Sequence, residues 1–202
     1  MKKTYAIPAA MFEHRYEIKK SAFIARVHHC TSKSAAKELL AQARRDYPDA
    51  RHHCWAYTLG NPLQPHSAAM SDDGEPSGTA GKPILNVLNH SDIGDIMIIV
   101  IRYFGGIKLG AGGLVRAYSA ASQQAIDLTL MAEHIPKQNF ALELDYQDEK
   151  NVRHLLDQYK GELLDAHYDS RVTLQISFPI DNQDVLTSMV KANHTMKLST
   201  KN

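Results

Sequence analysis

The 202-residue sequence has only two cysteines, Cys30 and Cys54, and no long hydrophobic run. Two cysteines are too few for the disulfide framework of a small secreted domain and are compatible with a reducing compartment. The longest apolar run, Ile96 to Ile101, is much shorter than a membrane-spanning helix. Acidic residues, beginning with Glu13, interrupt the N-terminal segment before any apolar run of signal-peptide length. We therefore expect a cytoplasmic protein that does not enter a membrane.

The sequence also has little net charge. The formal charge is +1, which argues against strong nonspecific binding to nucleic acid. The charges are unevenly distributed, because residues 1–135 contain 15 Lys and Arg against 12 Asp and Glu, whereas residues 136–202 contain 8 against 10. Any anionic partner is therefore expected to bind the first part of the chain.

One stretch, from Asp95 to Ala121, combines an apolar strand, a glycine-rich turn and the start of a helix. Ile96 to Val100 is continuously apolar and rich in β-branched residues, which predicts a strand buried on both faces. The helix that follows would expose unpaired backbone N–H groups at its start, and such groups attract anions. The stretch predicts an anion site with candidate residues Arg102, Tyr103, Gly105, Gly106, Lys108, Gly110, Gly112, Gly113 and Arg116.

The recognised nucleotide motifs are absent from this stretch and from the segment before it. Val115 stands where a dinucleotide fingerprint needs glycine or alanine, and Pro83 follows Lys82 where a Walker A loop needs serine or threonine. A glycine-rich turn can also serve only as a tight packing corner. No cofactor is predicted.

The preceding chain predicts the order β-β-α-β. Residues 16–30 alternate as extended structure with a break at residues 19–21, and Thr31 or Ser32 can cap a helix that ends by Pro48. Residues 51–59 predict a strand with His52 and His53 on opposite faces. Residues 60–81 have turn composition throughout and predict no regular element. Pro83 suits the first turn of a further helix, which would place Lys82 at its N-terminus.

Two groups of residues suggest metal binding, and each has a second interpretation. Asp72, Asp73 and Glu75 could bind a divalent cation, but their spacing differs from a calcium-binding loop and favours turn capping and pairing with Arg or Lys. The sets His28 with Cys30 and His52 with Cys54 could form a zinc site if their strands were adjacent, although strand cysteines are commonly buried hydrophobes. We predict no metal.

A second pattern begins after a hinge at residues 135–137. It comprises a strand at 140–144, a helix between Asp148 and Gly161, strands at 163–168 and 172–178, a helix from Asp181 and a strand at 196–198. This β-α-β-β-α-β order is that of a ferredoxin-like domain. The predicted domains are residues 1–135 and 136–202, both of the α+β class.

Three blocks resemble the signature segments of the IMPACT/YigZ family: ARHHCWAY from Ala50, SDDGEPSGTAGKPIL from Ser71 and VIRYFGGIKLGAGGLVRAY from Val100. The resemblance covers nearly the whole chain. It implies an N-terminal domain like domain IV of elongation factor G, with a ribosomal-protein-like β-α-β fold, and a ferredoxin-like second domain. It also adds Arg51, His52 and His53 to the candidate site, together with the loop acids and Lys82.

Three functions follow as hypotheses. The first is a non-enzymatic RNA- or ribosome-associated protein, linked by its resemblance to regulation of translation, in which the glycine loop and basic residues hold phosphate and Tyr103 or Phe104 offers a stacking face. The second is an enzyme or sensor for a small phosphorylated ligand, with His52, His53 or Asp73 available for proton transfer. The third is a protein-interaction module that acts through the C-terminal domain.

Overall fold

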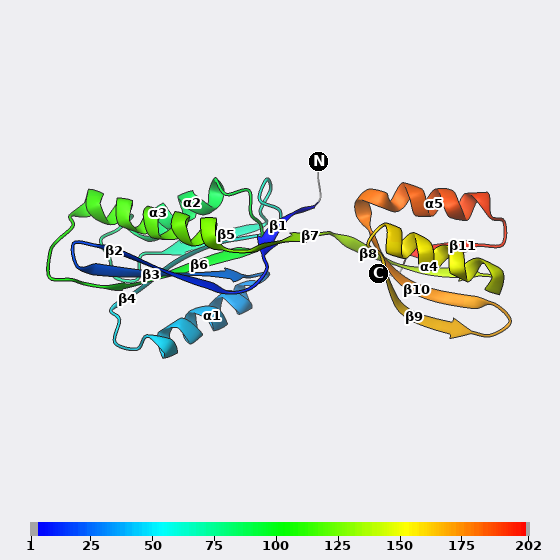
Figure 1. Ribbon diagram of the computed structural model, residues 1–202, viewed down its shortest axis with the longest axis horizontal. Coiled ribbons are helices and arrows are strands. Elements are labelled where there is room, and N and C mark those ends of the chain that lie inside the picture. The colour runs from blue at the N-terminus through cyan, green and yellow to red at the C-terminus, as the bar shows by residue number, and fades with distance from the viewer. Residues whose placement is uncertain (1–3, 201–202) are drawn as a thin grey trace. The chain divides into compact units, whose positions relative to one another are not determined.

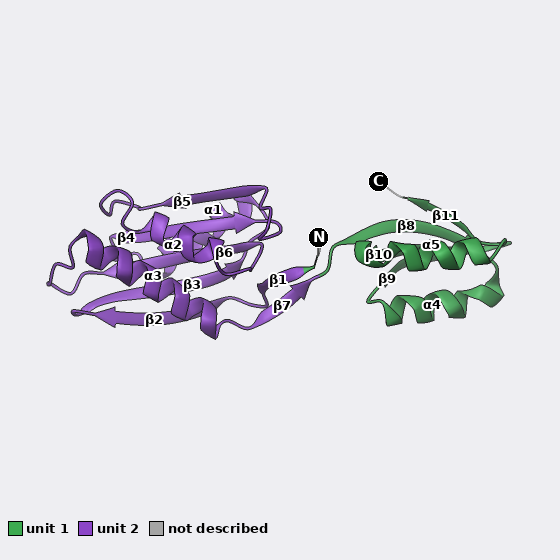
Figure 2. Ribbon diagram, turned by 90° about the horizontal axis from the view of Figure 1, so that it is seen from above, with its two compact units in different colours: residues 1–4, 135–202 green, residues 5–134 purple. Residues whose placement is uncertain are grey.

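A computed structural model describes residues 4–200 and contains two compact units (Figures 1 and 2). The larger unit spans Tyr5–His134, and the smaller unit contains the chain from Ile135 onward. Each unit has its own sheet and its own hydrophobic core. Both units mix helices with antiparallel strands, so the predicted α+β class is confirmed.

The larger unit is built on a five-stranded antiparallel sheet. Its strands, in spatial order, are β2 (Phe12–Ile18), β3 (Ser21–His29), β6 (Ile96–Tyr103), β4 (His52–Leu59) and β5 (Ser67–Ser71). The predicted extended segments, including the break at residues 19–21, are confirmed. The expectation that residues 60–81 hold no regular element is wrong, because β5 forms there. Its sequence of small residues carries little strand signal, and pairing with β4 creates it.

Helices cover both faces of this sheet (Figure 1). Helix α1 (Lys33–Asp46) packs on one face, and α2 (Gly81–Asn89) and α3 (Ala111–Leu128) pack on the other. The Oγ of Ser32 accepts a hydrogen bond from the N–H of Ala35 at 3.1 Å, which confirms the predicted cap of α1. Pro83 lies in the first turn of α2, as predicted.

The central strand β6 divides the core into two layers. Its residues Ile96, Ile98 and Val100 face α2 and α3, whereas Met97 and Ile99 face α1. All five are at most 1% exposed, which confirms the prediction of a strand buried on both faces. Burial of this kind places the end of β6, and the loop that follows it, in a fixed position.

A short ribbon of β1 (Tyr5–Pro8) and β7 (Met131–His134) completes the larger unit. Neither strand is apparent from the sequence, because both are short and lack clear alternation. Across residues 4–200, no helix is both long and apolar enough to cross a membrane.

The smaller unit has the element order predicted for it. It contains β8 (Lys137–Leu144), α4 (Glu149–Gln158), β9 (Glu162–Tyr168), β10 (Val172–Pro179), α5 (Gln183–Ala192) and β11 (Lys197–Thr200). Short 3-10 turns, η1 (Tyr146–Asp148) and η2 (Ile180–Asn182), precede the two helices. The strand order β11-β8-β10-β9, antiparallel throughout, confirms the ferredoxin-like fold.

Candidate functional site

A cleft of about 650 Å³ opens where β6 ends and the glycine loop, residues 104–110, leads into α3. It has polar and apolar walls from four segments of the larger unit. Its lining residues are Asp49, Arg51, His52, Glu75, Pro76, Arg102, Tyr103, Phe104, Lys108, Leu109, Gly110, Ala111 and Leu114. The end of the central strand thus meets the start of a helix at the cleft.

The N-terminus of α3 forms one wall of the cleft. Gly110 is the N-cap residue, with φ at 72°, and no side chain caps the helix. Its carbonyl accepts the first helical hydrogen bond, from the N–H of Leu114 at 2.9 Å. The preceding N–H groups lack helical partners, and the first turn contains no acidic residue. This helix end therefore carries a partial positive charge that favours an anion.

Two exposed cations, Arg51 and Lys108, line the same cleft. Among residues 4–200, neither side chain is part of an ion pair. The nearby acid Asp49 accepts a hydrogen bond from the Tyr103 hydroxyl at 2.7 Å. Burial and this bond raise the pKa of Tyr103 to about 12, so the phenol stays neutral. The two cations remain available to a ligand.

Phe104 gives the cleft an exposed aromatic surface. Its side chain lies directly after β6, and the residue is 57% exposed. The guanidinium carbon of Arg102 lies 5.7 Å from the centre of the Phe104 ring and 5.5 Å from that of Phe23. Such contacts hold the cation by attraction to the ring faces.

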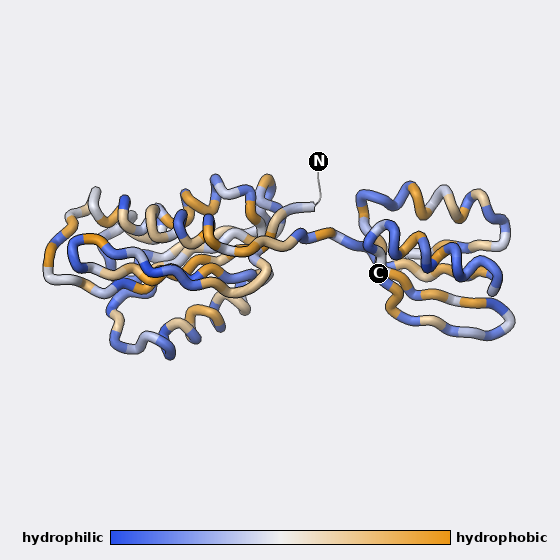
Figure 3. The backbone as a smooth tube through the Cα atoms, viewed as in Figure 1, coloured by the Kyte–Doolittle hydropathy of each residue, from blue (hydrophilic) through white to orange (hydrophobic). Residues whose placement is uncertain are grey.

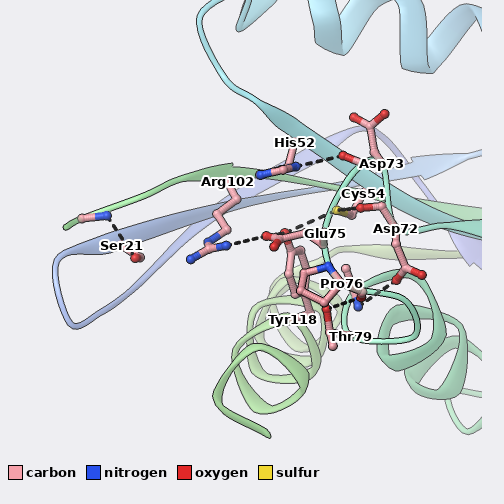
Figure 4. Close-up of polar contacts among 12 residues, drawn as sticks. Ser21, His52, Cys54, Asp72, Asp73, Glu75, Pro76, Thr79, Arg102 and Tyr118 are labelled. Atoms are coloured by element: carbon pink, nitrogen blue, oxygen red, sulfur yellow. Dashed lines mark hydrogen bonds and ion pairs between the residues drawn. The ribbon is translucent and has the colours of Figure 1, made fainter. Parts of the chain in front are cut away.

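A buried network supports this end of the cleft (Figure 4). Arg102 Nη1 lies 2.6 Å from Glu75 Oε1, and the two side chains are 9% and 4% exposed. The Tyr118 hydroxyl of α3 donates to the same oxygen at 2.7 Å, and the Cys54 thiol lies 3.3 Å from that hydroxyl. Burial raises the pKa of Cys54 to about 12. The Cys54 thiol therefore stays protonated and is not a reactive thiolate. The network joins β6, β4 and α3 to the acidic loop, which contains Asp72, Asp73 and Glu75.

The other two acids of the loop bind the backbone. One Asp72 carboxylate oxygen accepts from the N–H groups of Ala80 and Gly81 at the start of α2, and the other accepts from Gly78. Burial opposes ionisation of Asp72, but these three bonds outweigh it and lower its pKa. Asp73 pairs with Arg44 at 3.0 Å. The acids therefore fix the loop beside β4.

The two adjacent histidines occupy different environments. His52 is half-buried, lines the cleft and donates from Nδ1 to the Asp73 carbonyl at 2.9 Å. His53 is 4% exposed, and burial lowers its pKa. Its backbone N–H donates to Asp73 Oδ2 at 2.7 Å, but its ring is not part of the lining. Only His52 lies at the site.

The structure brings together part of the predicted residue set. The cleft contains Arg51, His52, Glu75, Arg102, Tyr103, Lys108 and Gly110. It is not lined by His53, Asp72, Asp73, Lys82, Gly105, Gly106, Gly112, Gly113 or Arg116. The sequence did not predict the hydrogen bond between Tyr103 and Asp49 or the contact between Tyr118 and Cys54. Both contacts join segments far apart in sequence, and no local pattern marks them.

The proposed zinc arrangement fails on topology. The strands that carry His28 and His52 are not adjacent, because β6 lies between β3 and β4. Within residues 4–200, no cluster of three or more His, Cys, Asp or Glu side chains could hold a metal ion.

These features define a two-domain α+β protein with a basic cleft at the end of its central strand. Residues 19–126 match the Impact N-terminal domain, and residues 142–191 match a domain of unknown function, DUF1949. The chain belongs to the IMPACT family.

Relatives from two bacteria support this assignment. The chain is 40% identical over 176 residues to the IMPACT family member YigZ of Escherichia coli, which covers 87% of this chain and 86% of the relative. It is 40% identical over 170 residues to an IMPACT family member of Haemophilus influenzae, covering 84% and 82%. A crystal structure of a hypothetical protein matches with a TM-score of 0.71 at 34% identity, covering 100% of this chain and 99% of that one.

Proposed function

We propose that this protein is a non-enzymatic RNA- or ribosome-associated protein, linked to regulation of translation, that holds RNA phosphate in the cleft. One observation carries the proposal: the uncapped start of α3, the cations of Arg51 and Lys108, and the exposed ring of Phe104 share one cleft. Phosphate needs N–H donors and positive charge, and an unpaired base needs a stacking face.

Arg102 has a supporting role in this proposal. Its guanidinium is already neutralised by Glu75 at 2.6 Å, so it contributes little net charge to the cleft. It holds the aromatic wall and the acidic loop in place instead. Direct phosphate contact is assigned to Arg51, Lys108 and the α3 backbone.

The side chains in the cleft and in the buried network behind it favour binding over catalysis. The Cys54 thiol, with its pKa raised to about 12 by burial, is a poor nucleophile at neutral pH. His52 uses Nδ1 to bond the Asp73 carbonyl, which leaves Nε2 for a ligand. Among the lining residues, the Tyr103 hydroxyl donates to Asp49, but burial and this bond raise the pKa of Tyr103 to about 12, so the phenol is also a poor nucleophile at neutral pH.

Salt-dependent binding of single-stranded RNA tests the proposal. An R51Q/K108Q variant should lower the slope of log affinity against log salt by about 1.4, because each lost phosphate contact contributes roughly 0.7 on a single strand. The matched control is K33Q/K37Q, which removes two exposed lysines from α1 on the opposite face of the sheet. Equal slopes for both variants, or binding that is independent of salt, would contradict the proposal.

Sedimentation with ribosomes tests whether the ribosome is the partner. The wild-type chain should move with ribosomal fractions at low salt and dissociate as salt rises, and R51Q/K108Q should remain at the top of the gradient. A wild-type chain that stays at the top at low salt would argue against stable ribosome association.

The cleft volume favours a second candidate, a sensor for a small phosphorylated ligand. A volume of about 650 Å³ lies within the usual range of small-molecule sites. A thermal-shift screen of nucleoside phosphates tests it. Ligand at a hundredfold excess over its dissociation constant should stabilise the protein by about 2.7 kcal/mol, and the absence of any shift would reject this candidate.

A further inference from the structure

The turn between β2 and β3 has an unusual composition for its backbone. Ile18 pairs with Ser21, so Lys19 and Lys20 are the two residues of a tight hairpin turn. Their φ angles are 46° and 62°, both in the left-handed region. Turns of this kind strongly prefer Asn-Gly, because glycine has no Cβ and the short polar side chain of Asn tolerates the left-handed region, whereas most other side chains are strained there. Two lysines therefore occupy positions that fit them poorly.

This turn is locked to the loop of the cleft. The N–H of Gly105 donates to Ser21 Oγ at 3.1 Å. A Cβ atom on Gly105 would lie only 2.0 Å from the carbonyl carbon of Lys20, so the two backbones touch. Phe104, whose ring lines the cleft, directly precedes this contact. The lysine turn and the cleft are therefore parts of one surface.

The charge of the turn is not used within the described chain. Lys19 and Lys20 are both exposed, and neither forms an ion pair with residues 4–200. Their acidic neighbour Glu17 pairs with Arg15 at 2.7 Å instead. Figure 3 shows the hydrophilic turn next to the more hydrophobic loop that leads from β6 to α3. Residues in strained backbone conformations cluster at functional sites, and here the strained positions hold two cations without an ion-pair partner among residues 4–200, which points to a function in binding.

We propose that Lys19 and Lys20 form a second phosphate contact for single-stranded RNA, next to the nucleotide held in the cleft. The inference rests on the proposed function. A base stacked on Phe104 must be unpaired, which favours a single strand over a duplex. The strand then passes the Gly105 contact, where the two lysines meet the adjacent phosphate. Basic groups at this position give affinity without sequence specificity.

Three variants of the full chain separate charge from backbone strain. K19Q/K20Q removes the charges and keeps side chains in the turn, K19N/K20G removes the charges and supplies the preferred turn residues, and K33Q/K37Q is the control on α1. The measurements are fluorescence anisotropy of a labelled oligouridylate over a salt series, and the melting temperature.

Both turn variants should bind the oligouridylate about 25-fold more weakly at about 0.1 M salt, with the salt slope reduced by roughly 1.4, as expected for two lost contacts. K19N/K20G should also melt about 2–4 °C higher than the wild type, because the strain is relieved. A variant that is more stable but binds more weakly excludes misfolding as the cause. The control should bind like the wild type.

The outcomes distinguish the two proposals. If R51Q/K108Q weakens binding and both turn variants bind like the wild type, the lysine contact is overturned and the cleft function stands. If the turn variants weaken binding and R51Q/K108Q does not, the lysine contact stands and the cleft function fails. If the wild type binds no oligouridylate, or binds duplex RNA equally well, the inference is overturned in either case.

Discussion

At the scale of single residues, the buried Arg102–Glu75 ion pair is the main electrostatic contact that stabilises the larger unit. A buried ion pair is costly to break from one side, because the remaining charge has no partner and little water. Glu75 is also the acceptor for Tyr118, so one oxygen serves a cation and a phenol. The pair connects the acidic loop to the central strand.

Glu75→Gln is therefore expected to destabilise the protein by about 3–5 kcal/mol, because it leaves the Arg102 charge buried and unpaired. Urea denaturation measures the change. The matched control is Glu17→Gln, whose pair with Arg15 is about 60% exposed on both sides and should cost at most about 1 kcal/mol. Similar losses of stability for the two variants would show that the buried ion pair contributes no more to stability than the exposed one.

His28 predicts how stability depends on pH. Burial, with a contribution from Arg26, lowers the pKa of His28 from 6.5 to about 4. The unfolded chain therefore binds the proton more readily than the folded chain between pH 6.5 and 4, so stability falls as pH falls through this window. The loss attributable to His28 between pH 7 and pH 5 is about 2 kcal/mol.

A His28→Gln variant tests this by denaturation at both pH values. The substitution should reduce the loss of stability between pH 7 and pH 5 relative to the wild type. His53, whose pKa burial also lowers, contributes in the same direction and remains in the variant. An unchanged pH dependence would mean that His28 is not the group that titrates.

At the scale of elements, the contact between the β2–β3 turn and the glycine loop fixes the mouth of the cleft. Glycines in this loop serve different purposes. Gly105 is required by the close approach of the Lys20 backbone, whereas Gly106 adopts a positive φ of 85° with open space around it. The two positions therefore respond differently to the same substitution.

Gly105→Ala should destabilise the protein by about 1–3 kcal/mol or more, because its Cβ would overlap the backbone of the turn and force the two segments apart. Gly106→Ala is the matched control and should cost about 1 kcal/mol from backbone strain alone. Thermal melts of both variants give the comparison. A smaller loss for Gly105→Ala than for Gly106→Ala would contradict the close contact.

The elements also show which features the sequence could predict. The strand β6 and the helix α3 have strong periodic patterns, so both are predictable from local sequence. Strand β5 has no such pattern and depends on its pairing with β4. The link between Arg102 and Glu75 spans 27 residues, and only the folded sheet brings the two side chains together. The basic residues at the cleft could be predicted, but which of them are already neutralised could not.

At the scale of the whole molecule, the two units differ in the surfaces they offer. The larger unit gathers an uncapped helix end, exposed cations and an exposed aromatic ring in one cleft. The ferredoxin-like unit has a separate core, and its fold alone specifies no partner. The proposed RNA contacts therefore lie in the larger unit.

The most direct test is to map where RNA crosslinks to the full chain. Oligouridylate bound at low salt is crosslinked by ultraviolet light, and the modified residues are identified by mass spectrometry. We predict crosslinks at Phe104 and His52, with fewer in the R51Q/K108Q variant. Crosslinks confined to the chain after Ile135, or unchanged by that variant, would contradict the claim that the cleft holds the RNA.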